Sequence, residues 1–188
     1  MARRYFDSSD ELIDWLTAAG IDVTGWGEGD SKTPADLWRE YVVGESYFFD
    51  DPPRRLVEVA QLLIRRGDMV LIEIEQEFAD GRRRSRLRLP SEKVMRGEEP
   101  ITAAVRCLQE ELGFGPGDVM MKIGDEFIQM TADSPSYPGL PTRYEFFTFE
   151  IIRDSLPDGD FYHENTAPGD PIRRHLWGWR KKRPETGD

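Results

Sequence analysis

The chain has 188 residues, of which 36 are acidic and 25 basic, and its formal net charge is −11. This balance makes nucleic acid an unlikely partner, and the single cysteine, Cys107, excludes an intrachain disulfide. No apolar run approaches the roughly 20 residues of a membrane helix, so we expect a soluble intracellular protein, in the cytoplasm or in an organelle after removal of a targeting peptide.

The charge is unevenly distributed along the chain. Residues 1–51 hold 12 acidic and 4 basic side chains, a net charge of −8. Residues 52–188 hold 24 acidic and 21 basic side chains. The asymmetry predicts an acidic appendage on a nearly balanced body.

The appendage carries helix signals. A capping-box pattern precedes residues 9–19, where apolar side chains follow helical spacing. Thr33 and Pro34 are typical of the cap and first position of a second short helix. The sequence DDPP then breaks the chain at residues 50–53. We therefore expect a helical N-terminal extension, 1–52, followed by a domain spanning 53–188.

The domain begins with strand patterns. Residues 55–64 and 69–78 are expected to be strands, and Asp80-Gly81 is a strong hairpin signal. A two-residue turn there pairs Glu77 with Arg84, Glu75 with Arg86 and Glu73 with Arg88. Because exposed alternating charge is common on sheets, ion pairing is favoured over ligand binding for this arginine row.

A loop and a helix follow, with the sequence PSEKVMRGEEPITAAVRCLQEELGF. Gly97 permits an unusual backbone geometry, Pro100 suits the first helical turn, and Gly113 ends the helix. Glu110 and Glu111 lie three and four residues after the cysteine, which places two carboxylates together near one loop.

Residues 92–114 resemble the signature of the Nudix superfamily, G-x5-E-x7-R-E-U-x-E-E-x-G-U, in which U is a bulky apolar residue. The matching residues are Glu98, Arg106, Leu108, Glu110, Glu111, Gly113 and Phe114. Two positions depart from it: Glu92 stands where the family has glycine, and Cys107 replaces the glutamate after the arginine.

The resemblance implies an α/β fold for the domain, a Nudix-like α/β/α sandwich with a mixed β-sheet. It also implies Mg²⁺ or Mn²⁺ as cofactor, held by Glu98, Glu110 and Glu111, with Arg106 pairing with a loop carboxylate. A thiol is a poor ligand for such hard cations, and Cys107 is more typical of a buried small hydrophobe. The site is therefore expected to be weakened, and the sequence leaves open whether the chain is an active pyrophosphohydrolase.

Three further features carry weaker expectations. In the loop 134–142, Tyr137 or Tyr144 could stack on a base, although packing is the commoner role for either. The basic segment RRHLWGWRKKR is expected to be a tail whose tryptophans dock on the body. His163 and His175 are too far apart in sequence to suggest a local metal site.

Two functions follow from these observations. The first is a divergent Nudix-family domain that binds a nucleoside-diphosphate-type or other pyrophosphate ligand, with weak or absent hydrolysis. The alternative is a noncatalytic protein-interaction module on the same scaffold, in which the aromatic N-terminal extension binds a protein partner.

Overall fold

The structure, a computed structural model, describes residues 3–29, 31–50, 52–115, 117–131, 133–152 and 156–181. The helices are α1 Ser9–Ala18, α2 Pro34–Val42 and α3 Pro100–Leu112. The strands are β1 Arg3–Arg4, β2 Tyr47–Asp50, β3 Pro53–Arg66, β4 Met69–Phe78, β5 Arg83–Arg88, β6 Ser91–Lys93, β7 Met120–Thr131, β8 Thr142–Ile152, β9 Phe161–Glu164 and β10 Ile172–Lys181. No helix in these ranges is long and apolar enough to span a membrane.

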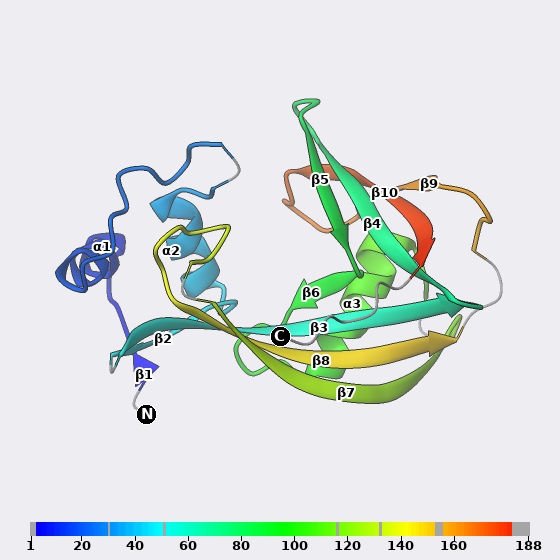
Figure 1. Ribbon diagram of the computed structural model, residues 1–188, viewed down its shortest axis with the longest axis horizontal. Helices are drawn as coiled ribbons and strands as arrows, with labels where there is room; N and C mark the ends of the chain where they lie inside the picture. The colour runs from blue at the N-terminus through cyan, green and yellow to red at the C-terminus, as the bar shows by residue number, and fades with distance from the viewer. Residues whose placement is uncertain are drawn as a thin grey trace. The chain divides into compact units, whose positions relative to one another are not determined.

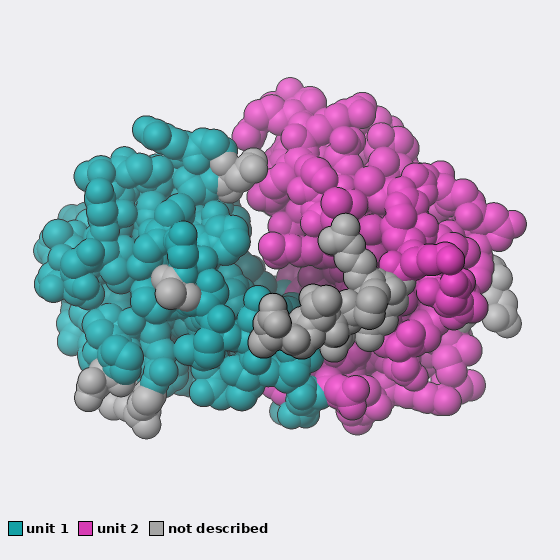
Figure 2. Space-filling model, viewed as in Figure 1, with its two compact units in different colours: residues 1–59, 93–99, 126–146 teal, residues 60–92, 100–125, 147–188 magenta. Residues whose placement is uncertain are grey.

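The chain divides into two compact units (Figure 2). Unit 1 comprises residues 1–59, 93–99 and 126–146, and unit 2 comprises residues 60–92, 100–125 and 147–188. Unit 1 thus contains the N-terminal extension together with three other stretches of chain. The domain boundary expected after residue 52 stays a prediction.

The two helices of the extension form where their caps predict them. Ser8 accepts a hydrogen bond from the backbone of Glu11, and Thr33 forms a complete capping box with Asp36 before Pro34. Their apolar faces meet loop 134–142 in a core shared by these residues: Phe6, Leu12, Leu16, Ile21, Trp26, Leu37, Tyr41, Phe48, Tyr137 and Leu140. Of the tryptophans of the extension, Trp26 belongs to this core, and Trp15 and Trp38 pack against it.

The sheet confirms the predicted α/β class with a mixed sheet. Its main path runs β1-β2-β3-β4-β10-β9, and β8 joins it by pairing with β3 and β7. The pairings of β4 with its neighbours are antiparallel, whereas the arrows of β3 and β8 point the same way in Figure 1. Among the described strands, β7 pairs with β8 alone and forms an edge.

The C-terminal basic segment is not a tail, which corrects the prediction. Residues 172–181 form β10, which lies between β4 and β9 in the sheet (Figure 1). Trp177 and Trp179 are buried, and Arg174 and Arg180 pair with Glu77 and Asp160 at 2.8 and 2.9 Å. The sequence of this segment is basic, but acidic side chains of unit 2 form ion pairs with its arginines.

The β4–β5 hairpin keeps its predicted turn but changes register. Gly81 lies in the turn at φ +85°. The observed pairs are Glu77–Arg83, Gln76–Arg84, Glu75–Ser85 and Glu73–Arg88. The predicted partners of Glu77 and Glu75 are therefore wrong by one residue. An irregularity between Glu73 and Glu75 brings Glu73 back opposite Arg88, as predicted.

Of the arginines predicted to face the acidic row of β4, Arg86 forms an ion pair with that row, whereas Arg84 donates to the neutral side chain of Gln76. Arg83 lies 3.4 Å from Glu75 and 3.3 Å from Glu77, and Arg86 lies 3.2 Å from Glu73. The acidic row is not a solvated face, however. Glu73 and Glu77 are buried. Strand β10 pairs along the other edge of β4, and its Arg174 and His175 contact these two carboxylates.

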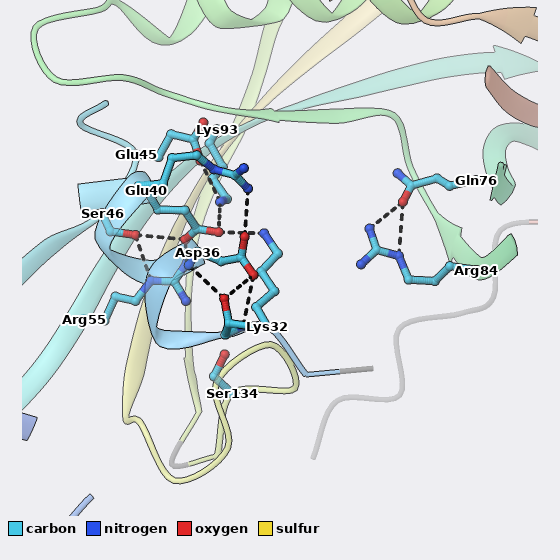
Figure 3. A network of polar contacts seen from close by, with 12 residues as sticks. Lys32, Asp36, Glu40, Glu45, Ser46, Arg55, Gln76, Arg84, Lys93 and Ser134 are labelled. Carbon is cyan, nitrogen blue, oxygen red and sulfur yellow. Dashed lines mark hydrogen bonds and ion pairs between the residues drawn. The ribbon is translucent and has the colours of Figure 1, made fainter. Parts of the chain in front are cut away.

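A buried ion network holds unit 1 together (Figure 3). The carboxylate of Glu40, 3% exposed, lies 2.6 Å from the ammonium groups of Lys32 and Lys93 and 2.8 Å from the guanidinium of Arg55. The Arg55 side chain also donates to the hydroxyl of Ser46 at 2.9 Å. One carboxylate on α2 thereby ties together the loop before that helix, β3 and β6.

Candidate functional site

The helix α3 occupies the position that the sequence pattern predicts. Gly97 adopts φ +80° before the helix and Gly113 adopts φ +71° after it, conformations that favour glycine. The amide of Phe114 donates to the carbonyl of Leu108 at 2.9 Å, which closes the last turn. The helix buries Cys107 completely, along with Ala103, Ala104, Leu108 and Leu112.

Strands β9 and β10 and the loop between them anchor the end of α3. The indole of Trp177 donates to the carbonyl oxygen of Glu111 at 3.2 Å. The amide of Thr166 donates to the carbonyl of Glu110 at 3.0 Å, and the His163 ring lies directly against Gly113. The backbone that carries both carboxylates is therefore fixed by residues more than fifty positions further along the chain.

Arg106 pairs with Glu92 at 3.1 Å, so it does meet a carboxylate that precedes the helix. Glu92 stands at the signature position that is glycine in the family. Both side chains are largely buried, which makes the pair more effective than one at the surface. The ion pair connects β6 to the middle of α3.

Glu111 lies among other carboxylates. Burial raises its pKa well above the ordinary value, and the charges of Glu73 and Glu92 raise it further, with Arg86 opposing them. Burial and the carboxylates of Glu111 and Glu92 likewise raise the pKa of the Cys107 thiol. Cys107 is therefore a neutral, buried thiol, in agreement with its predicted role as a small hydrophobe.

Glu73 and His175 were not identified as a pair from the sequence. His175 Nδ1 donates to the Glu73 carboxylate at 2.6 Å, and both side chains are almost fully buried. Burial opposes ionisation of Glu73, but His175 and Arg86 hold its pKa below the ordinary value. His163 lies opposite His175 on the neighbouring strand. No signal in the sequence links residues 73 and 175, because only the pairing of β4 with β10 brings them together.

Glu98 belongs to unit 1, whereas Glu110 and Glu111 belong to unit 2. The Glu98 carboxylate accepts a hydrogen bond from the amide of Met95 at 2.9 Å, and its own amide donates to the carbonyl of Met95 at the same distance. It thus closes the loop that contains Gly97. The contact gives this side chain a structural role in the loop.

Within the described ranges, no three His, Cys, Asp or Glu side chains are grouped to hold a metal ion. The thiol of Cys107 is buried and neutral at the position where a further carboxylate is expected. The residues present therefore do not fit a resident Mg²⁺ or Mn²⁺ held by protein ligands alone.

Tyr137 and Tyr144, the two candidates for stacking on a base, differ in how exposed they are. Tyr137 is fully buried, with its ring 5.1 Å from that of Trp26 and under the guanidinium of Arg55. It has no exposed face on which a base could stack. Tyr144 is partly exposed, its hydroxyl lies 3.3 Å from that of Ser134, and its ring stacks on Phe146.

We expect Glu111→Gln to stabilise the protein at pH 7. A neutral amide removes the repulsion that raises the pKa of this carboxyl, and single stabilising substitutions are commonly worth about 0.5–2 kcal/mol. Urea unfolding measures the gain, with Gln109→Ala at an exposed position of the same helix as control. A destabilised Glu111→Gln protein would show that the carboxylate makes a net favourable contact.

Comparisons with known proteins show no matching family model and no matching curated protein. Among solved structures, a C. elegans Ap4A hydrolase is similar, with TM-score 0.37 and 18% identity over 67% of this chain and 80% of that chain. An ADP compounds hydrolase is similar with TM-score 0.35 and 18% identity, over 71% of this chain and 67% of that chain.

Proposed function

We propose that this chain is a divergent Nudix-type domain that binds a nucleoside-diphosphate-type or other pyrophosphate ligand and hydrolyses it weakly or not at all. The ligand would enter as its complex with Mg²⁺ or Mn²⁺. Glu110 and Glu111 are the proposed carboxylate ligands to that cation, and Glu98 orders the loop before α3.

The observation that carries this proposal is the position of Glu111. Its carboxylate is held near Glu73 and Glu92, at the end of a glycine-bounded loop and helix, where ionisation is disfavoured. Carboxylates kept in such surroundings are more frequent at functional sites than elsewhere. A cation that arrives with its ligand would relieve this repulsion.

A cation that arrives with a diphosphate does not need three protein ligands. Mg²⁺ is commonly bound through one or two carboxylates, with phosphate and water oxygens completing its six ligands. A diphosphate supplies those phosphate oxygens itself. The proposal therefore requires the cation and the diphosphate to bind together, each weakly in the absence of the other.

Weak hydrolysis follows from Cys107. The family signature has a glutamate where this chain has a buried, neutral thiol. A thiol with a raised pKa neither binds a hard cation well nor accepts a proton from water at neutral pH. Loss of one ligand or base commonly costs about 10²–10⁴-fold in rate.

Calorimetric titration tests the proposal. ADP, ADP-ribose and Ap4A are titrated into the protein in EDTA, in Mg²⁺ and in Mn²⁺, and phosphate or nucleotide release is measured in the same samples. We expect binding of at least one compound with the cation, at least about tenfold weaker binding in EDTA, and release close to the rate without protein.

Glu111→Gln should weaken the cation-dependent binding at least about tenfold, a loss of 1.4 kcal/mol or more, while Gln109→Ala leaves it unchanged. Failure of every compound to bind would contradict the proposed ligand class. Rapid hydrolysis would contradict the weakened site instead. Binding that persists in Glu111→Gln would contradict the assigned residues.

The alternative of a protein-interaction module is less favoured by the structure. It requires the aromatic side chains of the extension to be available to a partner. Trp26 is buried, and Trp15 and Trp38 pack against the same core. The extension thus uses its tryptophans internally.

A further inference from the structure

Lys32 lies in an ionic cluster of unit 1 that the proposed function does not use. Its ammonium nitrogen and that of Lys93 each lie 2.6 Å from the same carboxylate oxygen, Oε1 of Glu40. The two nitrogens are therefore separated by no more than about 5 Å, twice that distance. The guanidinium of Arg55 lies 2.8 Å from the other oxygen, Oε2. Three cations thus share one carboxylate (Figure 3).

The three cations differ in how well their charges are compensated. Lys93 has a second carboxylate partner in Glu45, at 2.8 Å. Arg55 keeps its charge, because a guanidinium is not deprotonated in proteins. Within the residues that the structure describes, Lys32 forms an ion pair with Glu40 alone. Loss of the proton from Lys32 is therefore the change that most readily relieves the repulsion between the two ammonium groups.

The groups that face Lys32 favour its neutral amine. Burial lowers the pKa of Lys32, and the charge of Lys93 lowers it further. Glu40 opposes these effects, whereas Arg55 adds to them. Asp36, on the same helix as Glu40, is a further carboxylate within electrostatic range of Lys32. The balance of burial and like charge is thus stronger than the ion pair.

The Lys32 side chain is nevertheless open to a small molecule, since 30% of it is exposed. An amine is nucleophilic only in its neutral form, and lysines that are partly desolvated beside another cation are the ones that attack carbonyl compounds. A lysine whose role is only to pair with a carboxylate keeps its proton and does not react in this way. The cluster around Glu40 therefore has the composition of a site for a reactive amine.

We propose that Lys32 is a nucleophilic amine that condenses with small aldehydes to form a Schiff base. The ammonium group releases a proton to water, and the neutral nitrogen attacks the carbonyl carbon. A carbon–nitrogen bond forms while the second proton passes from nitrogen to the carbonyl oxygen. The proton released first returns on the leaving hydroxyl, so that the ammonium group and the aldehyde yield an iminium ion and one water molecule. The iminium ion is positive, and Glu40 keeps a cationic partner.

Reductive alkylation measures this reactivity at each lysine separately. The protein is treated at pH 7 with a limiting amount of propanal and cyanoborohydride, and mass spectrometry of its peptides gives the labelling rate at each site. Lys32 should react at least about fivefold faster than Lys181, whose side chain is 82% exposed. Unfolding in urea should bring the two rates together, because it removes the surroundings of Lys32.

Lys93→Met and Lys93→Arg separate charge from structure. The first removes the ammonium group that faces Lys32 and should lower its labelling rate at least about threefold, whereas the second keeps a cation and should preserve the rate. Far-UV circular dichroism shows whether each variant is folded.

Two results would overturn the proposal. One is labelling of Lys32 no faster than that of Lys181 in the folded wild-type protein. The other is an equal labelling rate of Lys32 in folded Lys93→Met and folded Lys93→Arg. If Lys93→Met does not fold, the ratio of Lys32 to Lys181 labelling in the wild-type protein, before and after urea, decides the question.

Discussion

Glu40→Gln is expected to lower the free energy of unfolding by about 3–5 kcal/mol, the usual cost of removing one partner from a buried ion pair. The substitution keeps the size of the side chain and removes the charge that Lys32, Arg55 and Lys93 share (Figure 3). Arg55 then remains buried, and Lys32 and Lys93 remain half-buried, without their common carboxylate. Urea unfolding at pH 7 measures the loss.

Glu45→Gln is the matched control. Glu45 contacts Lys93 at 2.8 Å but is more exposed than Glu40, so its removal should cost no more than about 1 kcal/mol. Equal losses for the two variants would contradict the central role of Glu40.

The same network predicts a pH dependence. Burial opposes ionisation of Glu40, but Arg55, Lys93 and Lys32 overcome it and hold its pKa well below the ordinary value of 4.5. A carboxyl with a lowered folded-state pKa stabilises the protein above its unfolded pKa, and this stabilisation is lost as the pH falls below it. The unfolding free energy should therefore fall more steeply below about pH 4.5 in the wild type than in Glu40→Gln.

Cys107→Glu is expected to destabilise the metal-free protein by about 3–5 kcal/mol, because it adds an unpaired charge at a fully buried position. Glu111, Glu92 and Glu73 already raise the pKa of the group at this position. The new carboxylate also restores the donor that the family signature contains. Mg²⁺ or Mn²⁺ should therefore raise the melting temperature of the variant above its value in EDTA.

Cys107→Gln separates charge from size. Glutamine has nearly the volume of glutamate but no charge, so it should be less destabilising and should not respond to the cation. If Mg²⁺ and Mn²⁺ leave the melting temperature of Cys107→Glu unchanged, the loop and helix do not hold a cation on their own even with this glutamate restored. An unchanged melting temperature with ADP and the cation added together would contradict the proposed ligand site.

Short-range features were predictable from the sequence. The helices α1 and α2 begin at the predicted caps, and α3 ends before Gly113. Caps and turns act through hydrogen bonds between residues a few positions apart, so they can be recognised locally. The hairpin at Gly81 was found in the same way, but its loop geometry shifted the register by one residue.

Long-range pairing was not predictable. The acidic row of β4 and the basic C-terminal segment each resemble exposed charged surface when considered alone. They are neighbours in the sheet, and their side chains neutralise each other, as Glu77 and Arg174 do at 2.8 Å. The pairing depends on which strand lies beside β4, which no local pattern specifies.

The sequence by itself determined the charge asymmetry, the helices of the extension, the loop-helix signature and its departure at Cys107, since each depends on residue type and short spacing. Only the tertiary structure decided that Tyr137 is buried, that Glu40 carries a buried network, and that Glu73 and His175 meet near Glu111. Burial and ionisation depend on groups that approach from distant parts of the chain. The net charge of −11 therefore says little about any one site, because these local surroundings set the charge state of each buried group.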